Sequence, residues 1–227
     1  MKTIIILFLF FTMTYARTLT LSVSKDVAVH TMSKKILEVA YAKIGIKPEF
    51  IYMQSNTSLL KVESGEVDGD VSRVKQVSAK FPNIIQVPVH INHIQAVVFG
   101  KSNTPHIKEW KDLEPYKFII IKGAKFIEYA TEDFNKTIGY DYKQAFKDLN
   151  NDKVELVVVP KKTGLIIIKE LGLTNINIVS PVLEEHDMYH VLHKRNIDLV
   201  EKLVPVLEEM KQSGEIKYIH QTYHLYK

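Results

Sequence analysis

The chain of 227 residues contains no cysteine. This absence excludes disulfide bonds, cysteine nucleophiles and thiolate metal sites. It also excludes the acylated cysteine that anchors bacterial lipoproteins. A secreted chain without that anchor would diffuse away from a cell with one membrane and is retained by a cell with two. If the chain is exported, its expected location is therefore the periplasm of a Gram-negative bacterium.

Long apolar runs are also scarce. The first, residues 4–11, follows Lys2 and precedes small residues at 14–16. This pattern is typical of a cleavable secretory signal, here residues 1–16, and is too short for a stable membrane span. We expect cleavage after Ala16, so that Arg17 begins the mature chain, and a retained anchor is the alternative. No later run is long enough to cross a membrane.

Charge of one sign is not concentrated anywhere in the sequence. The formal net charge is +4, and removal of Lys2 with the signal would lower it to +3. The basic residues are scattered and form no stripe with interleaved aromatic residues. We therefore expect no nucleic-acid partner.

Five of the nine histidines form two small groups, but neither group predicts a metal site. Neighbouring side chains in an extended segment point to opposite faces, and no nearby acidic pattern completes a ligand set. We predict no metal and no cofactor, and expect the histidines to tune the polarity of a hinge or cleft. The two groups are His90 with His93, and His186 with His190 and His193.

Strands and helices alternate along the first part of the chain. Apolar and β-rich segments predict strands at residues 18–23, 48–53 and 67–71. The helices between them are expected to be capped by Ser33 and Thr57 and to end at Gly45 and Gly65. Strands separated by helices are typical of a parallel sheet with helices on its faces.

The same alternation begins again after a break at residues 100–105. Before the break, Pro88 indicates an edge strand or extended segment at 84–89, and 94–99 is a strongly apolar strand. The later pattern predicts two closing helices, and Pro205 should kink the first of them or start a new turn. The other predicted elements are strands at 118–121, 154–159, 176–179 and 188–192 and helices near 126–134, 142–149 and 165–171.

This order predicts an α/β fold with two lobes, each a mostly parallel sheet flanked by helices. Residues 17–100 and 190–227 are expected to form the first lobe, and residues 101–189 the second. Two extended hinge crossings, near Phe99 and near His190, would join them. The closing helices should pack back on the first lobe. No feature requires a second chain, so we expect a monomer.

Arg73 and Ser72 follow the third predicted strand and are the leading candidates for a binding site. Ligands of open α/β sheets bind outside the carboxyl ends of the strands. A guanidinium there can hold a carboxylate with two parallel hydrogen bonds. The alternative is that Arg73 pairs with Glu66, Asp68 or Asp70. Ser72 has either a ligand-binding or a structural role.

Other polar residues complete the predicted ligand-binding set. Gly123 and Lys125 lie at a strand-to-helix turn, where backbone N–H groups bind anions readily; an ordinary tight turn is the alternative. Lys161 follows a second-lobe strand and is available to an anion, although solvated lysines are common. Ser24 and Asn92 lie near a strand exit and the first crossing, where turn or surface roles are the alternative.

The order of these features resembles the type II periplasmic solute-binding proteins, in particular those that bind amino acids and similar solutes for ABC importers. The resemblance covers nearly all of the expected mature chain. It rests on the signal, on Gly214 between the closing helices, and on the segments Gly65-Glu66-Val67-Asp68, Trp110-Lys111-Asp112-Leu113 and Ile120-Ile121-Lys122-Gly123.

The resemblance implies a clamp that closes on a small-molecule solute and delivers it to an ABC permease in the inner membrane. In relatives that bind amino acids, a first-lobe arginine holds the α-carboxylate and a second-lobe acid holds the α-amine. Here the arginine comes earlier, and the loop 24–31 lacks the usual proline and aromatic residue. The strand at 154–159 leads into Pro160 and two lysines instead of an acid. A dicarboxylate or another anion would fit those lysines better than an amine.

Two alternatives to an import receptor stay open. One is a periplasmic enzyme on the same scaffold, such as a dehydratase, for which Asp70 and Glu128 are available as general acid or base. No pair with a catalytic spacing stands out, so we expect binding without catalysis. The other is a sensing subunit whose closed form docks to a signalling protein.

Overall fold

The computed structural model describes residues 18–25 and 27–222. The expected signal, residues 1–16, and its cleavage site lie outside this part of the chain. Within it, no helix combines the length and the apolar character that a membrane crossing requires.

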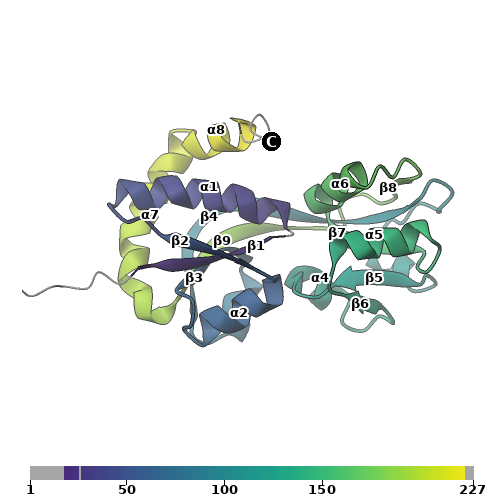
Figure 1. Cartoon of the computed structure of the whole chain (residues 1–227), viewed down its shortest axis with the longest axis horizontal. Coiled ribbons are helices and arrows are strands. Elements are labelled where there is room, and N and C mark those ends of the chain that lie inside the picture. The colour runs from purple at the N-terminus through teal and green to yellow at the C-terminus, as the bar shows by residue number, and fades with distance from the viewer. Residues whose placement is uncertain (1–17, 26, 223–227) are drawn as a thin grey trace, which may run out of the picture.

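The first part of the chain forms a parallel three-stranded unit with helices on both sides (Figure 1). β1 pairs in parallel with β2 on one side and with β3 on the other. The apolar face of α1, with Ile36, Leu37 and Ala40, is fully buried. The elements are β1 (Thr20–Ser24), α1 (Ala28–Lys43), β2 (Glu49–Met53), α2 (Ser55–Glu63), β3 (Gly69–Val74) and α3 (Gln76–Lys80).

Both predicted helix caps in this part are wrong, because each helix starts earlier. Ser33 lies inside α1, where its hydroxyl donates to the carbonyl of Val29, and Thr57 lies inside α2. Val29 and Met32 are buried and extend the apolar face of α1 toward its start. Tertiary burial of an apolar face outweighs local capping preferences.

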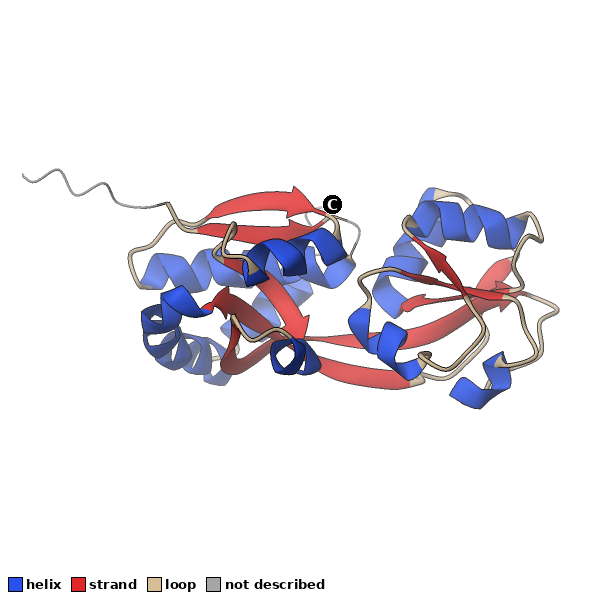
Figure 2. Cartoon of the chain, turned by 90° about the horizontal axis from the view of Figure 1, so that it is seen from below, coloured by secondary structure: helices blue, strands red, loops and turns tan. Residues whose placement is uncertain are grey.

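Two long antiparallel strands, β4 (Ile84–Lys101) and β9 (Glu184–His193), run between the two parts of the molecule (Figure 2). β9 also pairs with β3, and the far end of β4 pairs with β7 (Leu156–Pro160) and β8 (Ile176–Ile178). In the described part of the chain the strands therefore form one nine-stranded sheet, with the order β2-β1-β3-β9-β4-β7-β5-β6 and β8 beside β4.

The prediction that the segments 84–89 and 94–99 are separate strands is wrong. Both belong to β4, a continuous strand of 18 residues, of which, among the described residues, only the part from Ala96 onward has strands on both sides. The predicted edge position of 84–89 agrees with the pairing, because in the described chain this segment pairs with β9 on one side and with no strand on the other. Pro88 is tolerated because the register with β9 shifts between Gln86 and His90. At such a bulge the missing N–H of proline removes no regular ladder hydrogen bond.

The second part of the chain repeats the parallel arrangement. β5 lies between β6 and β7 and is parallel to both. The sequence did not indicate β6, because it is a short, largely exposed edge strand. The remaining elements are η1 (Trp110–Leu113), β5 (Phe118–Ile121), α4 (Lys125–Ala130), β6 (Thr137–Gly139), α5 (Tyr142–Asn150) and α6 (Lys161–Glu170).

The closing helices, α7 (Ile197–Gln212) and α8 (Glu215–Thr222), follow the short η2 (Lys194–Asn196) and pack on the first part as predicted. The buried residues of α7 are Leu199, Leu203, Leu207 and Met210, and the helix continues through Pro205. The predicted two-lobed α/β fold is confirmed. We use first lobe for β1–β3, α1–α3, α7 and α8, and second lobe for β5–β8 and α4–α6, while β4 and β9 extend through both.

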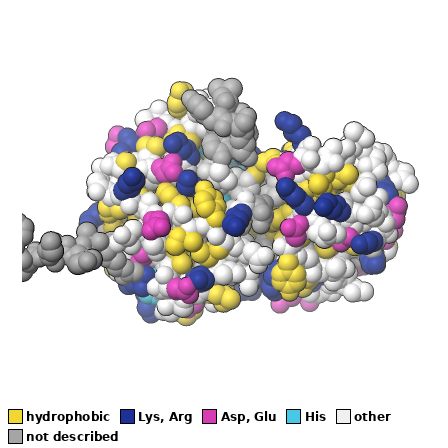
Figure 3. Space-filling model, viewed as in Figure 1, with side chains coloured by type: hydrophobic (Ala, Val, Ile, Leu, Met, Phe, Trp, Pro, Cys, Tyr) yellow, Lys and Arg dark blue, Asp and Glu magenta, His cyan; other side chains and the backbone are white. Residues whose placement is uncertain are grey.

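The surface drawn in Figure 3 carries acidic and basic side chains interspersed over both lobes. One hydrophobic cluster lies within the first lobe, between its sheet, α1 and α7. The other fills the second lobe and reaches across to Val27, Val74 and Val77 of the first. The two lobes therefore meet through apolar contacts as well as through the crossing strands.

Close packing at Gly164 of α6 generates a stability prediction. A Cβ atom there would lie 2.2 Å from Cε2 of Phe99, whose ring is fully buried. We expect Gly164→Ala to lower the free energy of unfolding by about 1–3 kcal/mol, as overpacking does, despite a gain in helix propensity. Urea unfolding measures this change. Leu165→Ala, at a position 42% exposed on the same helix, should change stability by no more than about 0.5 kcal/mol. Stability of Gly164→Ala at or above that of the parent would contradict the packing.

Candidate functional site

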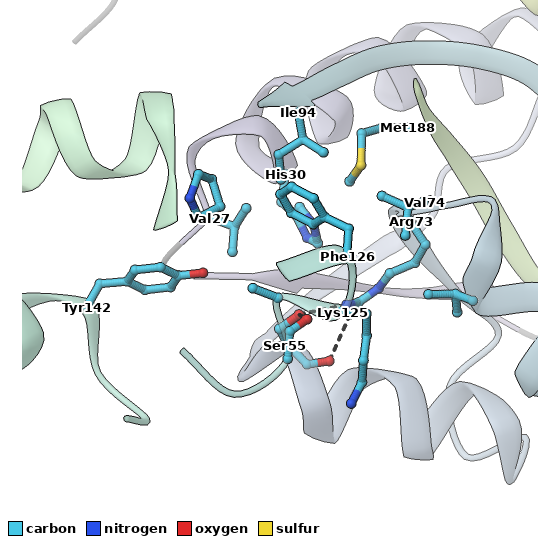
Figure 4. A pocket seen from close by; sticks show the side chains of 14 residues that line it. Val27, His30, Ser55, Arg73, Val74, Ile94, Lys125, Phe126, Tyr142 and Met188 are labelled. Atoms are coloured by element: carbon cyan, nitrogen blue, oxygen red, sulfur yellow. Dashed lines mark hydrogen bonds between the residues drawn. The ribbon is translucent and has the colours of Figure 1, made fainter. Parts of the chain in front are cut away.

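A cavity of about 30 Å³ lies between the two lobes (Figure 4). The first lobe contributes residues of α1, α2, β3 and α3, and the second contributes the turn before α4 and the starts of α4 and α5. β4, β9 and the end of β7 complete the walls. The lining residues are Val27, His30, Ser55, Arg73, Val74, Val77, Ile94, Gly123, Ala124, Lys125, Phe126, Tyr142, Pro160 and Met188.

Arg73 is the central cation of this cavity, and its side chain is only 4% exposed. Its Nη2 donates to Oδ2 of Asp70 at 2.5 Å and to the carbonyl of Ser55 at 2.9 Å, and Nη1 donates to Oγ of Ser55 at 2.6 Å. Among the described residues its buried Nε has no hydrogen-bond partner. Arg73 is therefore paired with Asp70 and also lines the cavity, and its Nε has no partner among the described residues.

A bulge brings Asp70 and Arg73 together. In a regular strand, side chains three residues apart point to opposite faces. The pairing of β3 with β9 shifts register between Asp70 and Arg73. Such a shift re-aims side chains locally, and here it lets carboxylate and guanidinium meet.

Asp70 is fully buried and satisfied by several donors. It accepts from the hydroxyls of Ser22 and Ser58 and from the backbone N–H of Ser72. Burial alone would raise the pKa of Asp70, but the charge of Arg73 and the hydrogen bonds from Ser58 and Arg73 hold that pKa below its usual value. Asp70 is therefore a fixed anion, which does not suit a general acid working near neutral pH.

Two buried histidines flank this carboxylate. Nδ1 of His30 accepts from the backbone N–H of Ser24 at 3.3 Å and lies 3.9 Å from Asp70. Nδ1 of His190 lies 2.8 Å from the carbonyl of Asp70 and must donate to it, so Nε2 accepts from the hydroxyl of Tyr41 at 2.8 Å. Burial lowers the pKa of each histidine to about 4. Both are therefore neutral at physiological pH.

The sequence predicted that the backbone N–H of Gly123 and the side chain of Lys125 bind a solute anion. In the structure both bind the carboxylate of Glu128 instead. The backbone N–H of Gly123 donates to the Glu128 carboxylate, and Nζ of Lys125 lies 2.8 Å from it. Burial would raise the pKa of Glu128, but the hydrogen bonds from Lys125 and Gly123 and the nearby lysine charges keep it below its usual value. Glu128 is thus also an anion with a structural role.

Ser55 connects the two lobes. Its hydroxyl accepts from Arg73 and donates to the carbonyl of Gly123 at 3.1 Å. Gly123 has a φ of 98°, and a Cβ atom there would lie 2.8 Å from Cβ of Ser55. A second interlobe hydrogen bond joins the N–H of Ala28 to Oγ1 of Thr163 at 3.2 Å. Glycine at position 123 is therefore what allows the two lobes to approach so closely.

The structure brings together part of the predicted ligand-binding set. Arg73, Gly123 and Lys125 line the interlobe cavity. Ser24 lines a neighbouring cavity of about 60 Å³, which shares Ser55 and Tyr142 with the first. Contact of any of these residues with a solute stays a prediction.

The other predicted residues do not line these cavities. Ser72 is fully buried, and its hydroxyl has no hydrogen-bond partner in the described residues. Lys161 begins α6 directly after Pro160, which does line the interlobe cavity. Asn92 lies in a separate groove, and its amide donates to the carbonyl of Val29 at 3.2 Å.

Sequence reasoning missed Ser55 and Tyr142. Tyr142 lines the interlobe cavity and two neighbouring ones, and it separates them. Neither residue belongs to a recognisable sequence motif. Each becomes part of the site only because the two lobes lie against each other in the folded chain. In residues 18–25 and 27–222, no three or more metal-ligating side chains lie close enough together to hold a metal ion.

Comparison with known proteins agrees with this architecture. The profile of the bacterial extracellular solute-binding proteins, family 3, matches residues 32–226. The chain is also similar to an uncharacterized protein of Shewanella oneidensis, with 22% identity over 197 residues that cover 82% of this chain and 74% of that protein. The chain therefore belongs to the bacterial extracellular solute-binding proteins, family 3.

Solved structures show the same fold at low sequence identity. A histidine kinase sensor domain with similarity to periplasmic binding proteins has a TM-score of 0.79 at 17% identity, covering 91% of this chain and 95% of that one. The ligand-binding core of GluR0 with L-glutamate has a TM-score of 0.78 at 14% identity, covering 91% and 98%. An ancestral arginine-binding protein bound to arginine has a TM-score of 0.76 at 19% identity, covering 90% and 97%.

The buried histidines generate a prediction for the pH dependence of stability. His30 and His190 have folded-state pKa values near 4, whereas the unfolded chain titrates near 6.5. Between these values the unfolded state binds more protons, so the free energy of unfolding falls as pH falls from about 6.5 toward 4. Each histidine contributes a slope of at most about 1.4 kcal/mol per pH unit.

We expect His190→Gln to reduce this slope between pH 6.5 and 5 by up to about 1.4 kcal/mol per pH unit, because one of the two buried histidines is gone. Urea unfolding at several pH values measures the slope. Exposed His106 provides the control, and His106→Gln should leave the slope unchanged. An unchanged slope in His190→Gln would contradict the neutral, buried state of His190.

Proposed function

We propose that this protein is a periplasmic solute receptor that captures a small carboxylate-bearing solute, an amino acid or organic anion, between its lobes. The closed form would then dock on an ABC permease of the inner membrane and deliver the solute. The observation that carries this proposal is the buried guanidinium of Arg73, which lines an interlobe cavity and whose Nε has no partner within the described part of the chain. Membership of the solute-binding family supports it.

Solute entry would require the lobes to separate. The cavity of about 30 Å³ holds roughly one water molecule, whereas ligand pockets typically measure about 300–1,000 Å³. The solute carboxylate docks on Arg73 while the lobes are apart. Closure then brings Ser55 to Gly123, excludes water and strengthens the charged contacts.

The hinge in this proposal consists of β4 and β9. Both strands extend through the two lobes and pair with each other between them. We place the first lobe at residues 17–100 and 190–227 and the second at 101–189. Residues 96–101 of β4 pair with β7 and β8 of the second lobe, so the bending segment of β4 would precede Ala96. Bending of a few residues at such crossings is a common mechanism of lobe closure.

A sensing role is the second candidate, favoured by the likeness to a histidine kinase sensor domain. Neighbouring genes for a permease and an ATPase would support import, and a neighbouring sensor kinase would support signalling. Catalysis is not part of the proposal. Asp70 and Glu128, the acids available for it, each hold a cation as a fixed anion.

The role of Arg73 can be tested without leaving a buried charge unpaired. Removing Arg73 alone would strand Asp70 at a cost of about 3–5 kcal/mol, so the test variant is Arg73→Gln with Asp70→Asn. We expect solute affinity to fall by about tenfold or more, since a hydrogen bond to a charged group contributes about 1.5–3 kcal/mol. Isothermal titration with the tightest-binding member of a carboxylate panel measures this loss.

Asp70→Asn alone retains the guanidinium and is the control for affinity. Because Arg73 then lacks its buried anion, circular dichroism must first show that this variant is folded. It should bind that solute at least as tightly as the parent does. Parent-like affinity in the double variant would remove Arg73 from the site.

Closure can be tested at Gly123. In Gly123→Ala the added methyl group would collide with Ser55 and Asn56, so we expect the lobes to stay apart and solute affinity to fall about tenfold. Small-angle scattering should show a larger radius of gyration with solute present than the parent has. Gly172→Ala is the control, because Gly172 also has a positive φ but a Cβ atom there would have no other atom within 4 Å. Equal behaviour of the two variants would contradict the closure contact.

A further inference from the structure

The walls of the interlobe cavity are mainly apolar. Aliphatic side chains line it from the first lobe, and an aromatic ring and a proline face them from the second (Figure 4). The hinge strands add Ile94 and Met188. A solute enclosed here must place most of its surface against hydrocarbon. The main apolar contributors are Val27, Val74, Val77, Phe126, Pro160 and Met188.

The described residues that line the cavity include positively charged side chains but no aspartate or glutamate. Arg73 and Lys125 both line it. The nearest acids lie behind them: Asp70 is fully buried against Arg73, and Glu128 is occupied by Lys125 and the N–H of Gly123. The remaining titratable residue on the first-lobe side of the wall is His30. Its Nδ1 accepts a hydrogen bond from the backbone N–H of Ser24.

This arrangement treats the two ends of a zwitterion differently. Arg73 lines the cavity, and once the lobes separate a carboxylate can accept from its guanidinium, whose buried Nε has no partner among the described residues. An ammonium group enclosed in the same cavity would lose its hydration and gain no anionic partner from the described wall. Burying an ion without a partner costs several kcal/mol. The cavity therefore selects against the charge that defines an amino acid.

We propose that the solute is a carboxylate with an apolar body and no ammonium group, such as a branched aliphatic or aryl-substituted short-chain acid. This inference rests on the proposed function, since it names the solute class of the same cavity. It differs from an amino-acid specificity by one functional group, so matched compounds test it directly.

The test compares pairs that differ by the ammonium group: 4-methylpentanoate against L-leucine, and 3-phenylpropanoate against L-phenylalanine. Isothermal titration of the full-length mature protein should show tighter binding of the deaminated member by about tenfold or more. Equal or tighter binding of the amino acid would overturn the inference and leave the receptor function standing. If none of these compounds bound, and neither L-glutamate nor L-arginine bound, both the inferred solute class and the proposed receptor function would be contradicted.

A wall substitution adds a second readout. Ala124 is the N-cap of α4, lines the cavity and makes no side-chain capping bond. Aspartate and asparagine are both favourable N-caps, so Ala124→Asp and Ala124→Asn should both fold. We expect Ala124→Asp to shift the preference toward L-leucine by about tenfold, because it supplies the missing anion, and Ala124→Asn to leave the preference unchanged. An unchanged preference in Ala124→Asp would overturn the inference.

Asp26 precedes Val27 in the sequence and lies outside the described residues, so the same titrations include Asp26→Asn. The deaminated compounds should remain preferred by both the parent and this variant. A parent preference for L-leucine that disappears in Asp26→Asn would overturn the inference by assigning the ammonium to that carboxylate.

Discussion

The buried ion pair between Asp70 and Arg73 is the interaction on which the site depends. Neither charge would be stable in the interior alone. The bulge in β3 aligns the two side chains, and hydroxyls of Ser22 and Ser58 satisfy the carboxylate. The guanidinium is thereby fixed in the wall of the interlobe cavity. Ser55 accepts a hydrogen bond from it and donates one to the carbonyl of Gly123 in the second lobe.

This pairing also determines what the cavity can recognise. A guanidinium that already holds one carboxylate attracts a second less strongly than a free one does, so charge alone cannot supply high affinity. Apolar contact must supply much of the remainder, at about 25 cal/mol for each Å² buried. The hydrophobic cluster that crosses from Val74 and Val77 to Phe126 provides such a surface. Lobe closure and solute desolvation are therefore parts of one process.

Local patterns in the sequence predicted the alternating elements and the two-lobed class, because these depend on periodicity. They placed Arg73 after a strand at 67–71, whereas it lies within β3 (Gly69–Val74). The predictions were wrong where contacts between residues far apart in the sequence determine the limits of a helix or strand. Burial started α1 before Ser33, and pairing with β9 joined the segments 84–89 and 94–99 into one strand. Ser55 gave no signal, since its role exists only when Gly123 approaches from the other lobe.

The central claim is that a solute carboxylate docks on Arg73 within the closing cleft. The most direct measurement is the Nε–Hε NMR signal of Arg73 during titration with a carboxylate that the protein binds. The arginines of the chain are Arg17, Arg73 and Arg195, so the spectrum of Arg73→Lys identifies the signal. The account predicts a saturable shift with the dissociation constant that calorimetry gives for the same solute. Saturable binding that leaves this signal unchanged would contradict it.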